Sequence, residues 1–507
     1  MSIPVIDLFA GPGGLGEGFS SIIREDGTRA FKIQLSIEKD EHAHQTLELR
    51  AFFREFPPKK APADFYKYLR GEITRDELLA RFPIEAASAA KEAWLGELGG
   101  KSAPNDEVDR RIRDAIGSAR RWMLIGGPPC QAYSLVGRSR RMNDPEFAKD
   151  EKHFLYKEYL RILAVHKPPV FVMENVKGLL SAKIRKEGIF EQIRKDLEHP
   201  LFAIGLGTKD DLKYKFYPLI PTTGELLEHY KPEDFVIHSE NFQIPQARHR
   251  IIILGVRSDW KSKPELLNPS KTQITIEQVI GDLPRLRSGI SKEPDSAEKW
   301  RDAVHELVEA KWLSSNEITF KLQEKLASAI KRVGANLSRG ESFLTKAVKP
   351  EFHKDWFVDA KLKGVCNHET RSHIRADLHR YFFAAVFARE FGRSPLLEDL
   401  PKALLPKHEN VKEALKETKF NDRFRVQLAG RPSTTVVSHI SKDGHYYIHY
   451  DPSQCRSLTV REAARLQTFP DNYFFEGPRT QQYHQVGNAV PPLLARQIAK
   501  IVADMLA

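Results

Sequence analysis

A single cysteine follows a glycine- and proline-rich turn in the stretch 124–134, LIGGPPCQAYS. The apolar residues up to Ile125 have the pattern of a buried strand, and Gly126 and Gly127 let the backbone turn sharply or approach a ligand. Two prolines then restrict the chain immediately before Cys130. Because open α/β sheets bind ligands at the carboxyl ends of their strands, we interpret Cys130 as a candidate nucleophile. The alternative is a small buried apolar residue, which a lone cysteine usually is.

A second apolar stretch, 168–176 (PPVFVMENV), also ends in polar side chains, Glu174 and Asn175. If its strand and the strand before Cys130 belong to one parallel sheet, Glu174 and Cys130 face the same cleft. A partly desolvated carboxyl group could donate a proton there near neutral pH. Alternatively, Glu174 caps the end of the strand and has no chemical role.

A third polar group precedes the apolar strand IIILGV, in the segment 246–250, QARHR. In strand alternation Gln246, Arg248 and Arg250 point to one face and present an amide and two guanidinium groups in a row. Such a row suits anionic or hydrogen-bonding atoms of a ligand. A surface edge strand would use the same residues.

The first 19 residues predict a buried strand, a glycine-rich turn (AGPGGLG) and a helix. This order opens the nucleotide pocket of a Rossmann-type sheet, because glycine lets the backbone approach the ligand closely. A second strand, 32–37, ends at Glu38, which could accept both hydroxyl groups of a ribose. Glu38 could equally cap the helix that begins near Asp40.

Composition indicates a soluble, folded chain of two or three domains: 507 residues, 41% hydrophobic and 29% charged. The sequence contains neither an apolar run long enough to span a bilayer nor a basic secretory leader at its start, so we expect a cytoplasmic protein without a membrane partner. The three cysteines form no CxxC pair, and Cys366, His368 and His373 are one ligand short of a zinc site, so we expect no metal.

The pattern along the chain divides it into three parts. Residues 1–264 and 431–507 carry the strands and helices of one domain, with a charged, alanine-rich helical insertion at about 51–120. Residues 265–430 are irregular and interleave aromatic with cationic side chains. From 261 to 425 there are 31 basic and 24 acidic residues, an excess of seven out of eleven for the whole chain. This excess indicates a polyanionic partner, although such a charge is also ordinary for a soluble protein.

Seven parts of the chain, taken together, resemble the cytosine-5 DNA methyltransferases. The matching residues, in the order of that family, are 7–14 (DLFAGPGG), Glu38, 126–134 (GGPPCQAYS), 174–176 (ENV), 246–250 (QARHR), 459–470 (TVREAARLQTFP) and 485–492 (QVGNAVPP). The resemblance implies an α/β fold: a Rossmann-like class I methyltransferase domain with the helical insertion, and a smaller, irregular target-recognition domain at 265–430.

The resemblance also implies a reaction, the methylation of cytosine carbon 5 in double-stranded DNA. In it, the Cys130 thiolate adds to cytosine carbon 6, Glu174 hydrogen-bonds or protonates ring nitrogen 3, and Arg248 holds the base. Gln131, Asn175 and Arg250 support these groups. Because a stacked base is out of reach, the target cytosine would be flipped out of the duplex. The methyl donor is S-adenosylmethionine, and the chemistry needs no metal.

Two further sets of residues are implied by the resemblance. The cofactor would contact Phe9, Gly11, Gly13, Gly14, Glu38, Asn488 and Ala489, with Asp109 on the adenine amino group and Asp106 as the competing candidate. DNA would contact Ser134, Arg138, Gln246, Arg371 and Arg375.

Several expectations about the context remain open at this point. We expect a monomer acting on bacterial nucleoid DNA, with a separately encoded restriction endonuclease as a candidate partner. A tRNA methyltransferase of the same family is the nearest rival, but its variable region would be short. A regulator that keeps the fold without catalysis would not need Cys130, Glu174 and Arg248. A nicotinamide dehydrogenase would explain the glycine-rich turn but not Cys130.

Overall fold

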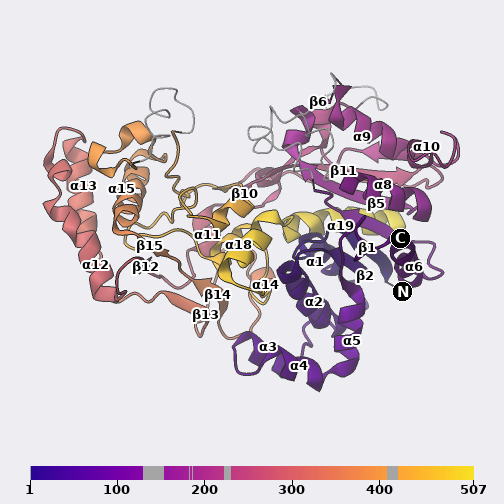
Figure 1. Cartoon of the computed structure of the whole chain (residues 1–507), viewed down its shortest axis with the longest axis horizontal. Helices are drawn as coiled ribbons and strands as arrows, with labels where there is room; N and C mark the ends of the chain where they lie inside the picture. Colours follow the sequence, from indigo (N-terminus) through magenta and orange to yellow (C-terminus); the bar gives the residue numbers. More distant parts are fainter. Residues whose placement is uncertain (1, 130–153, 182, 185–186, 222–229, 408–420) are drawn as a thin grey trace.

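We describe a computed structural model of the chain, for residues 2–129, 154–181, 183–184, 187–221, 230–407 and 421–507. Cys130, Gln131, Ser134 and Arg138 lie outside the described residues. The protein has two lobes, with the central sheet in one and the helices α12, α13 and α15 at the far end of the other (Figure 1). Among the described residues, no helix combines the length and apolar composition needed to cross a membrane.

An eight-stranded sheet forms the core of the larger lobe, in the order β3-β2-β1-β4-β5-β11-β8, with β9 also paired to β11. The strands from β3 to β5 run parallel, and β11 runs antiparallel to β5, β8 and β9. The strands are β1 (Ile3–Leu8), β2 (Phe31–Glu38), β3 (Ala93–Leu95), β4 (Met123–Gly126), β5 (Val170–Val176), β8 (Tyr214–Tyr217), β9 (Val236–His238) and β11 (His249–Arg257). This arrangement confirms the Rossmann-like expectation.

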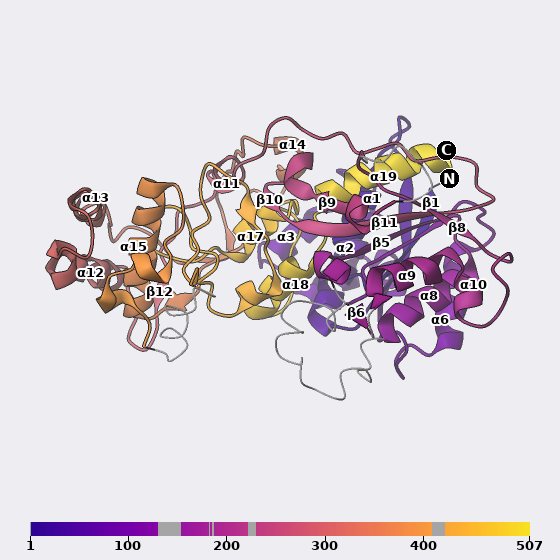
Figure 2. The same ribbon diagram turned by 90° about the horizontal axis from the view of Figure 1, so that it is seen from above.

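Helices cover both faces of this sheet, because alternate side chains of the strands are apolar on both sides. In β1, Val5 packs into one core and Ile6 into the other. The first core includes α1 (Gly14–Ser20) and α19 (Pro492–Leu506); the second includes α6 (Asn105–Ile116), α8 (Phe154–His166) and α9 (Ile189–Glu198). The two groups lie on opposite sides of the strands in Figure 2.

The helical insertion is shorter than predicted. Residues 51–120 include β3, which pairs with β2, and α6, which packs against the sheet. The added part is α3 (Ala63–Leu69), α4 (Arg75–Arg81) and α5 (Pro83–Glu92), packed on α2 (Glu41–Glu55). β3 was not predicted because it has only three residues and directly follows a helix. So short a strand has no alternating pattern that could be recognised in the sequence.

The second lobe is built around α12 (Ala297–His305), α13 (Phe320–Ile330) and α15 (Arg375–Phe391), which share one apolar core. That core also contains Ile448 and Cys455, so the chain returns to this lobe after residue 431. Conversely, β14 (Val365–Glu369) lies in the predicted target-recognition segment but packs its Cys366 against the core of α2–α5. The boundary at 430 therefore does not separate two independent units of packing.

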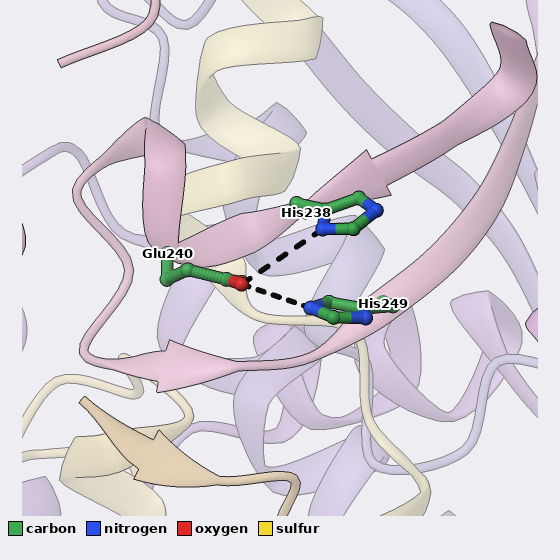
Figure 3. Close-up of side chains that lie close together, drawn as sticks. All are labelled: His238, Glu240 and His249. Atoms are coloured by element: carbon green, nitrogen blue, oxygen red, sulfur yellow. Dashed lines mark hydrogen bonds and ion pairs between the residues drawn. The ribbon is translucent and has the colours of Figure 1, made fainter.

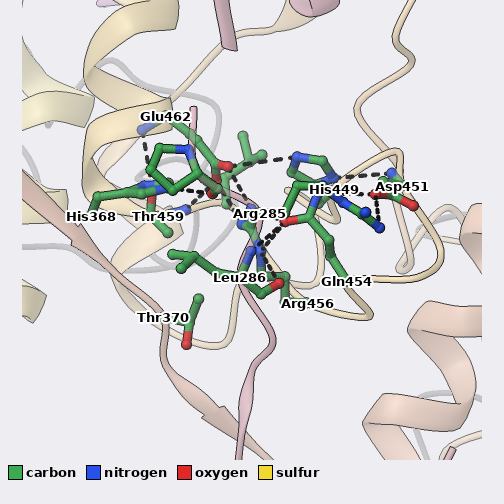
Figure 4. Close-up of polar contacts among 12 residues, drawn as sticks. Arg285, Leu286, His368, Thr370, His449, Asp451, Gln454, Arg456, Thr459 and Glu462 are labelled. Carbon is green, nitrogen blue, oxygen red and sulfur yellow. Dashed lines mark hydrogen bonds and ion pairs between the residues drawn. The ribbon is translucent and has the colours of Figure 1, made fainter. Parts of the chain in front are cut away.

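A buried polar network joins segments from both sides of that boundary (Figure 4). Arg456 donates to both carboxylate oxygens of Glu462, at 2.7 and 2.6 Å, and also to the carbonyl of Leu286 at 3.1 Å. Thr459 caps α17 (Val460–Leu466) in the predicted capping box with Glu462. The ring nitrogens of His368 bond with the Thr459 hydroxyl and the Pro284 carbonyl.

Charge pairing keeps this network ionised although it is buried. Burial raises the pKa of Glu462, but the charge and hydrogen bonds of Arg456 outweigh it and hold that pKa well below its usual range. Burial lowers the pKa of His368 to about 4, so its ring is neutral near pH 7. The three residues considered above as an incomplete zinc set, Cys366, His368 and His373, are all buried. Both ring nitrogens of His368 already bond within the protein.

We predict that Glu462→Gln destabilises the protein by about 3–5 kcal/mol, because it leaves the Arg456 guanidinium buried without a counter-ion. Chemical denaturation of both proteins measures the difference. Glu107→Gln is the control, since Glu107 pairs with Arg110 on the surface and its loss should leave the midpoint nearly unchanged. Equal midpoints for Glu462→Gln and wild type would contradict the role of the pair.

Candidate active site

The turn that precedes Cys130 lies against the end of β5. β4 and β5 are parallel neighbours, with Gly126 opposite Met173, so Glu174 follows directly alongside Gly127. A Cβ atom at Gly127 would lie 3.1 Å from Glu174 Oε2, and the Asn175 amide donates to the Pro128 carbonyl at 3.3 Å. Glu174 therefore lies beside Gly127 of this turn, while Cys130, with which it was predicted to share a cleft, lies outside the described residues.

Arg250 fixes the Glu174 carboxylate from the neighbouring strand. Its Nε lies 2.9 Å from Glu174 Oε1, and its Nη1 donates to the His249 carbonyl. Both side chains of the pair are largely buried, with 13% and 14% of their surface exposed. Burial lowers the pKa of Arg250, and the Glu174 carboxylate opposes that effect. The pair can therefore hold a carboxyl group in one orientation at the carboxyl edge of the sheet.

Arg248 is buried beside this pair and is held by the C-terminal part of the chain. It donates from Nη1 to the Val436 carbonyl at 2.7 Å and from Nη2 to the Gly487 carbonyl at 3.2 Å. Burial lowers its pKa, as does the nearby charge of Arg250. Its Nε has no hydrogen-bond partner among the described residues and could serve a ligand.

Gln246 does not lie on a DNA-facing surface, contrary to the prediction. Its side chain is completely buried, donates to the Leu466 carbonyl and to Gln467 Oε1, and accepts from the Val436 amide. The reason is that β10 (Gln246–Ala247) pairs with β16 (Ser433–Thr434), so returning chain covers the face on which alternation placed it.

The predicted cofactor residues meet at the ends of β1 and β2. Phe9, Gly11 and Gly13 all have positive φ, of 55°, 57° and 89°, and nothing lies within 4 Å of the position of a Cβ on Gly11. Glu38 accepts from the Gly11 amide at 2.7 Å and from the amides of residues 39 and 40. Burial raises the pKa of Glu38. Asp40, and not Glu38, caps α2.

The C-terminal motif closes this region from the other side. A Cβ atom at Gly14 would collide with the carbonyl of Val490, so the stretch that contains Asn488 and Ala489 touches the start of α1. Asn488 ends α18 (Arg479–Asn488), and Ala489 is buried. Open backbone at Gly11, a tethered acid at Glu38 and this contact fit a bound nucleoside with an attached amino-acid chain.

Asp109 is not positioned as predicted for the adenine amino group. It lies on α6 and is bound by Arg161 Nη1 at 3.0 Å and by His166 Nε2 at 2.8 Å, both from α8. An acid that the sequence analysis did not consider, Glu97, follows β3, where Leu95 is paired with Glu38. Glu97 lines an open pocket of about 430 Å³ and forms an ion pair with Lys39 at 3.0 Å. Because β3 has no recognisable pattern in the sequence, the motif Leu-Gly-Glu that ends at Glu97 is the signal that points to this acid.

Two of the three arginines predicted to contact DNA, Arg371 and Arg375, form contacts within the protein. Arg371 is buried, donates to the carbonyls of Lys442 and Ile440 at 2.7 and 2.8 Å, and lies over the ring of Tyr483. Arg375 is paired with Glu293 at 2.7 Å and with Glu306. Arg371 therefore serves packing within the protein, whereas Arg375, with 37% of its side chain exposed, stays a candidate for contact with DNA.

A buried carboxyl group lies under the glycine-rich turn. Asp7 in β1 is 1% exposed, and a Cβ on Gly16 of α1 would lie 3.3 Å from its Oδ2. Burial raises the pKa of Asp7 to about 8, against the opposing charge of Arg54. The group is therefore largely protonated in the folded protein at neutral pH.

Known proteins are similar to this chain in sequence. A family model described as C-5 cytosine-specific DNA methylase matches residues 101–204 and 219–503. The chain is 32% identical over 521 residues to the type II methyltransferase M.Bpa9945I of Bacillus paralicheniformis, covering 99% of each. It is 25% identical to the DNA (cytosine-5-)-methyltransferase M.ApeKI of Aeropyrum pernix, covering 76% of this chain and 81% of that one.

A solved structure shows the same fold. It is described as a DNA modification methyltransferase encoded within an E. coli prophage, with a TM-score of 0.52 and 18% identity, and the match covers 100% of this chain and 99% of that one.

We predict that Asp7→Asn weakens the pH dependence of stability between about pH 4 and 8. In this range folded Asp7 keeps a proton that the unfolded chain has lost, so its contribution to stability falls as pH rises, by up to about 1.4 kcal/mol per pH unit. Denaturation of both proteins at several pH values measures their unfolding free energies. As pH increases, the unfolding free energy of the wild type should fall relative to that of the variant. Parallel profiles would show that Asp7 is ionised in the fold.

Proposed function

Because the chain belongs to the C-5 cytosine-specific DNA methylase family, its activity is the methylation of cytosine carbon 5 in DNA, and we propose which residues carry it out. The observation that supports the assignment most directly is the position of Glu174 beside the turn that leads to Cys130. A nucleophile that follows this turn and an acid at the end of β5 would reach opposite sides of one flipped base.

The first step needs a thiolate and an acid together. Cytosine carbon 5 is a poor nucleophile, so the Cys130 sulfur first bonds to carbon 6. Glu174 donates a hydrogen bond or a proton to ring nitrogen 3 and so stabilises the charge that enters the ring. Carbon 5 then accepts the methyl group, and loss of the carbon 5 proton with the Cys130 thiolate restores the ring.

The arginines position this pair. Arg250 holds the Glu174 carboxylate at 2.9 Å, and Asn175 holds the Pro128 carbonyl. Arg248, whose Nε has no other partner among the described residues, would hold the base. Gln131 would support the loop that begins at Cys130.

S-adenosylmethionine, when bound, supplies the methyl group. The chain would hold it with the backbone of Phe9, Gly11, Gly13 and Gly14, with Glu38 on the ribose, and with Asn488 and Ala489 near the methionine end. Glu97 would take the adenine amino group in place of Asp109, since Glu97 follows β3 and Asp109 is bound by Arg161 and His166.

The relatives named type II methyltransferases support a role in restriction and modification. The enzyme would act as a monomer on the nucleoid DNA of a bacterial cytoplasm and protect it from a separately encoded endonuclease. Sequencing the DNA of cells that express the chain, with a readout for 5-methylcytosine, tests this role and identifies the methylated site. Methyl transfer to tRNA but not to duplex DNA would overturn it.

We predict that Glu174→Gln slows methyl transfer by about 10²-fold or more, because the amide cannot protonate the ring. Single-turnover transfer of a labelled methyl group to duplex DNA measures the chemical step. Glu191→Gln on α9 removes a carboxylate outside the site and should keep the wild-type rate. A near-normal rate in Glu174→Gln would remove this residue from the mechanism.

We predict that Cys130→Ser abolishes methyl transfer but retains DNA binding, because the hydroxyl is a much poorer nucleophile than a thiolate. Duplex DNA with 5-fluorocytosine at the target should trap wild-type enzyme as a covalent adduct, since fluorine cannot leave as the proton does. Mass spectrometry should map the adduct to Cys130. An adduct on another residue would disprove the assignment.

A further inference from the structure

Two histidines and a glutamate converge on the side of β9 and β11 (Figure 3). His238 ends β9 and His249 begins β11, and the two are direct partners in the antiparallel pairing. Their rings stack with centroids 3.9 Å apart and an angle of 28°. Glu240, in the short helix η6 (Ser239–Phe242), directs its carboxylate toward both rings.

The three potential ligand atoms all lie within 4.8 Å of one another. Glu240 Oε1 is 2.8 Å from His249 Nε2 and 3.9 Å from His238 Nδ1. The second oxygen, Oε2, is buried and has no hydrogen-bond partner among the described residues. The side chains of Glu240, His249 and His238 are 13%, 32% and 42% exposed, so the group opens toward solvent on the histidine side.

A hydrogen bond between His249 and Glu240 explains part of this arrangement. It does not explain why the second ring lies against the first, with its Nδ1 too far from the carboxylate for a hydrogen bond at 3.9 Å. A metal ion would use both nitrogens at once. Tetrahedral zinc, with bonds of about 2.0–2.2 Å, needs donors about 3.4 Å apart, which small side-chain rotations here would provide.

The chemistry of the donors suits a borderline transition metal. Two imidazoles and one carboxylate are a common ligand set for Zn²⁺, whereas Mg²⁺ and Ca²⁺ prefer oxygen alone. Lys177 near His238 opposes a cation, and the Glu240 carboxylate, deeper in the site, counters it.

We propose that His238 Nδ1, His249 Nε2 and Glu240 Oε1 form a binding site for one divalent transition-metal ion of the Zn²⁺ class, with a fourth position open to solvent. The ion takes no part in methyl transfer. It joins the two ends of the segment 239–248, which carries Gln246 and Arg248. Binding therefore stabilises the segment that positions Arg248 beside Glu174.

Titration of the full-length, tag-free protein with Co²⁺ tests the site, because tetrahedral Co²⁺ absorbs in the visible range and reports its ligands. We expect one equivalent to bind, and His238→Asn and Glu240→Gln each to weaken binding about tenfold or more, since even outer-shell changes cost about 10–100-fold. Zn²⁺ should displace Co²⁺ and raise the thermal midpoint of wild type but not of the variants.

The matched control is His199→Asn. His199 lies 3.9 Å from Glu198 on α9, a histidine and carboxylate pair without a second ring, so its loss should leave Co²⁺ affinity unchanged. The Cys130→Ser protein should bind Co²⁺ as wild type does. Loss of binding in that protein, unchanged binding in His238→Asn and Glu240→Gln, or no stoichiometric binding by wild type would each overturn the proposal. The midpoint of each variant without metal verifies that it is folded.

Discussion

The parallel pairing of β4 with β5 is the constraint on which the active site depends. It sets Gly126 opposite Met173, and every later position follows: Gly127 lies against Glu174, and Pro128 lies within reach of Asn175. Because parallel strands end at the same edge, a turn after one strand and a carboxylate after the next must meet. The antiparallel β11 then adds Arg250 from the opposite direction, which a parallel strand would place at the far edge.

Burial of charged side chains is the main energetic cost of this arrangement, and specific partners offset it. Arg248 has two backbone carbonyls, Arg250 has Glu174, and Arg456 has Glu462. Each partner lies in a distant part of the sequence or a few residues along the chain. Loss of one partner leaves an uncompensated buried charge. The two bonds of Arg248 tie Val436 and Gly487 to the start of β11, so the C-terminal segment forms part of the structure around Glu174.

The two lobes are joined because each one packs residues that belong, by their place in the sequence, to the other. Phe343, Leu362 and Cys366 pack on the α2–α5 side, while Ile448 and Cys455 belong to the core around α15. The network of Arg456, Glu462, Thr459 and His368 lies at this junction (Figure 4). Segments from both sides of residue 430 therefore meet in one buried polar network.

The sequence by itself determined the buried apolar strands β1, β2, β4, β5 and β11, the glycine-rich turn, the Thr459 cap and the helix 154–166, because local pattern and side-chain chemistry specify them. It also placed Glu174 and Glu38 at the ends of strands, where the structure has them. Only the tertiary structure decided that Gln246 and Arg371 are buried, that Asp109 pairs with Arg161, and that β3 delivers Glu97. Those outcomes depend on which distant segment covers a face or pairs with an edge, and no local pattern encodes the partner.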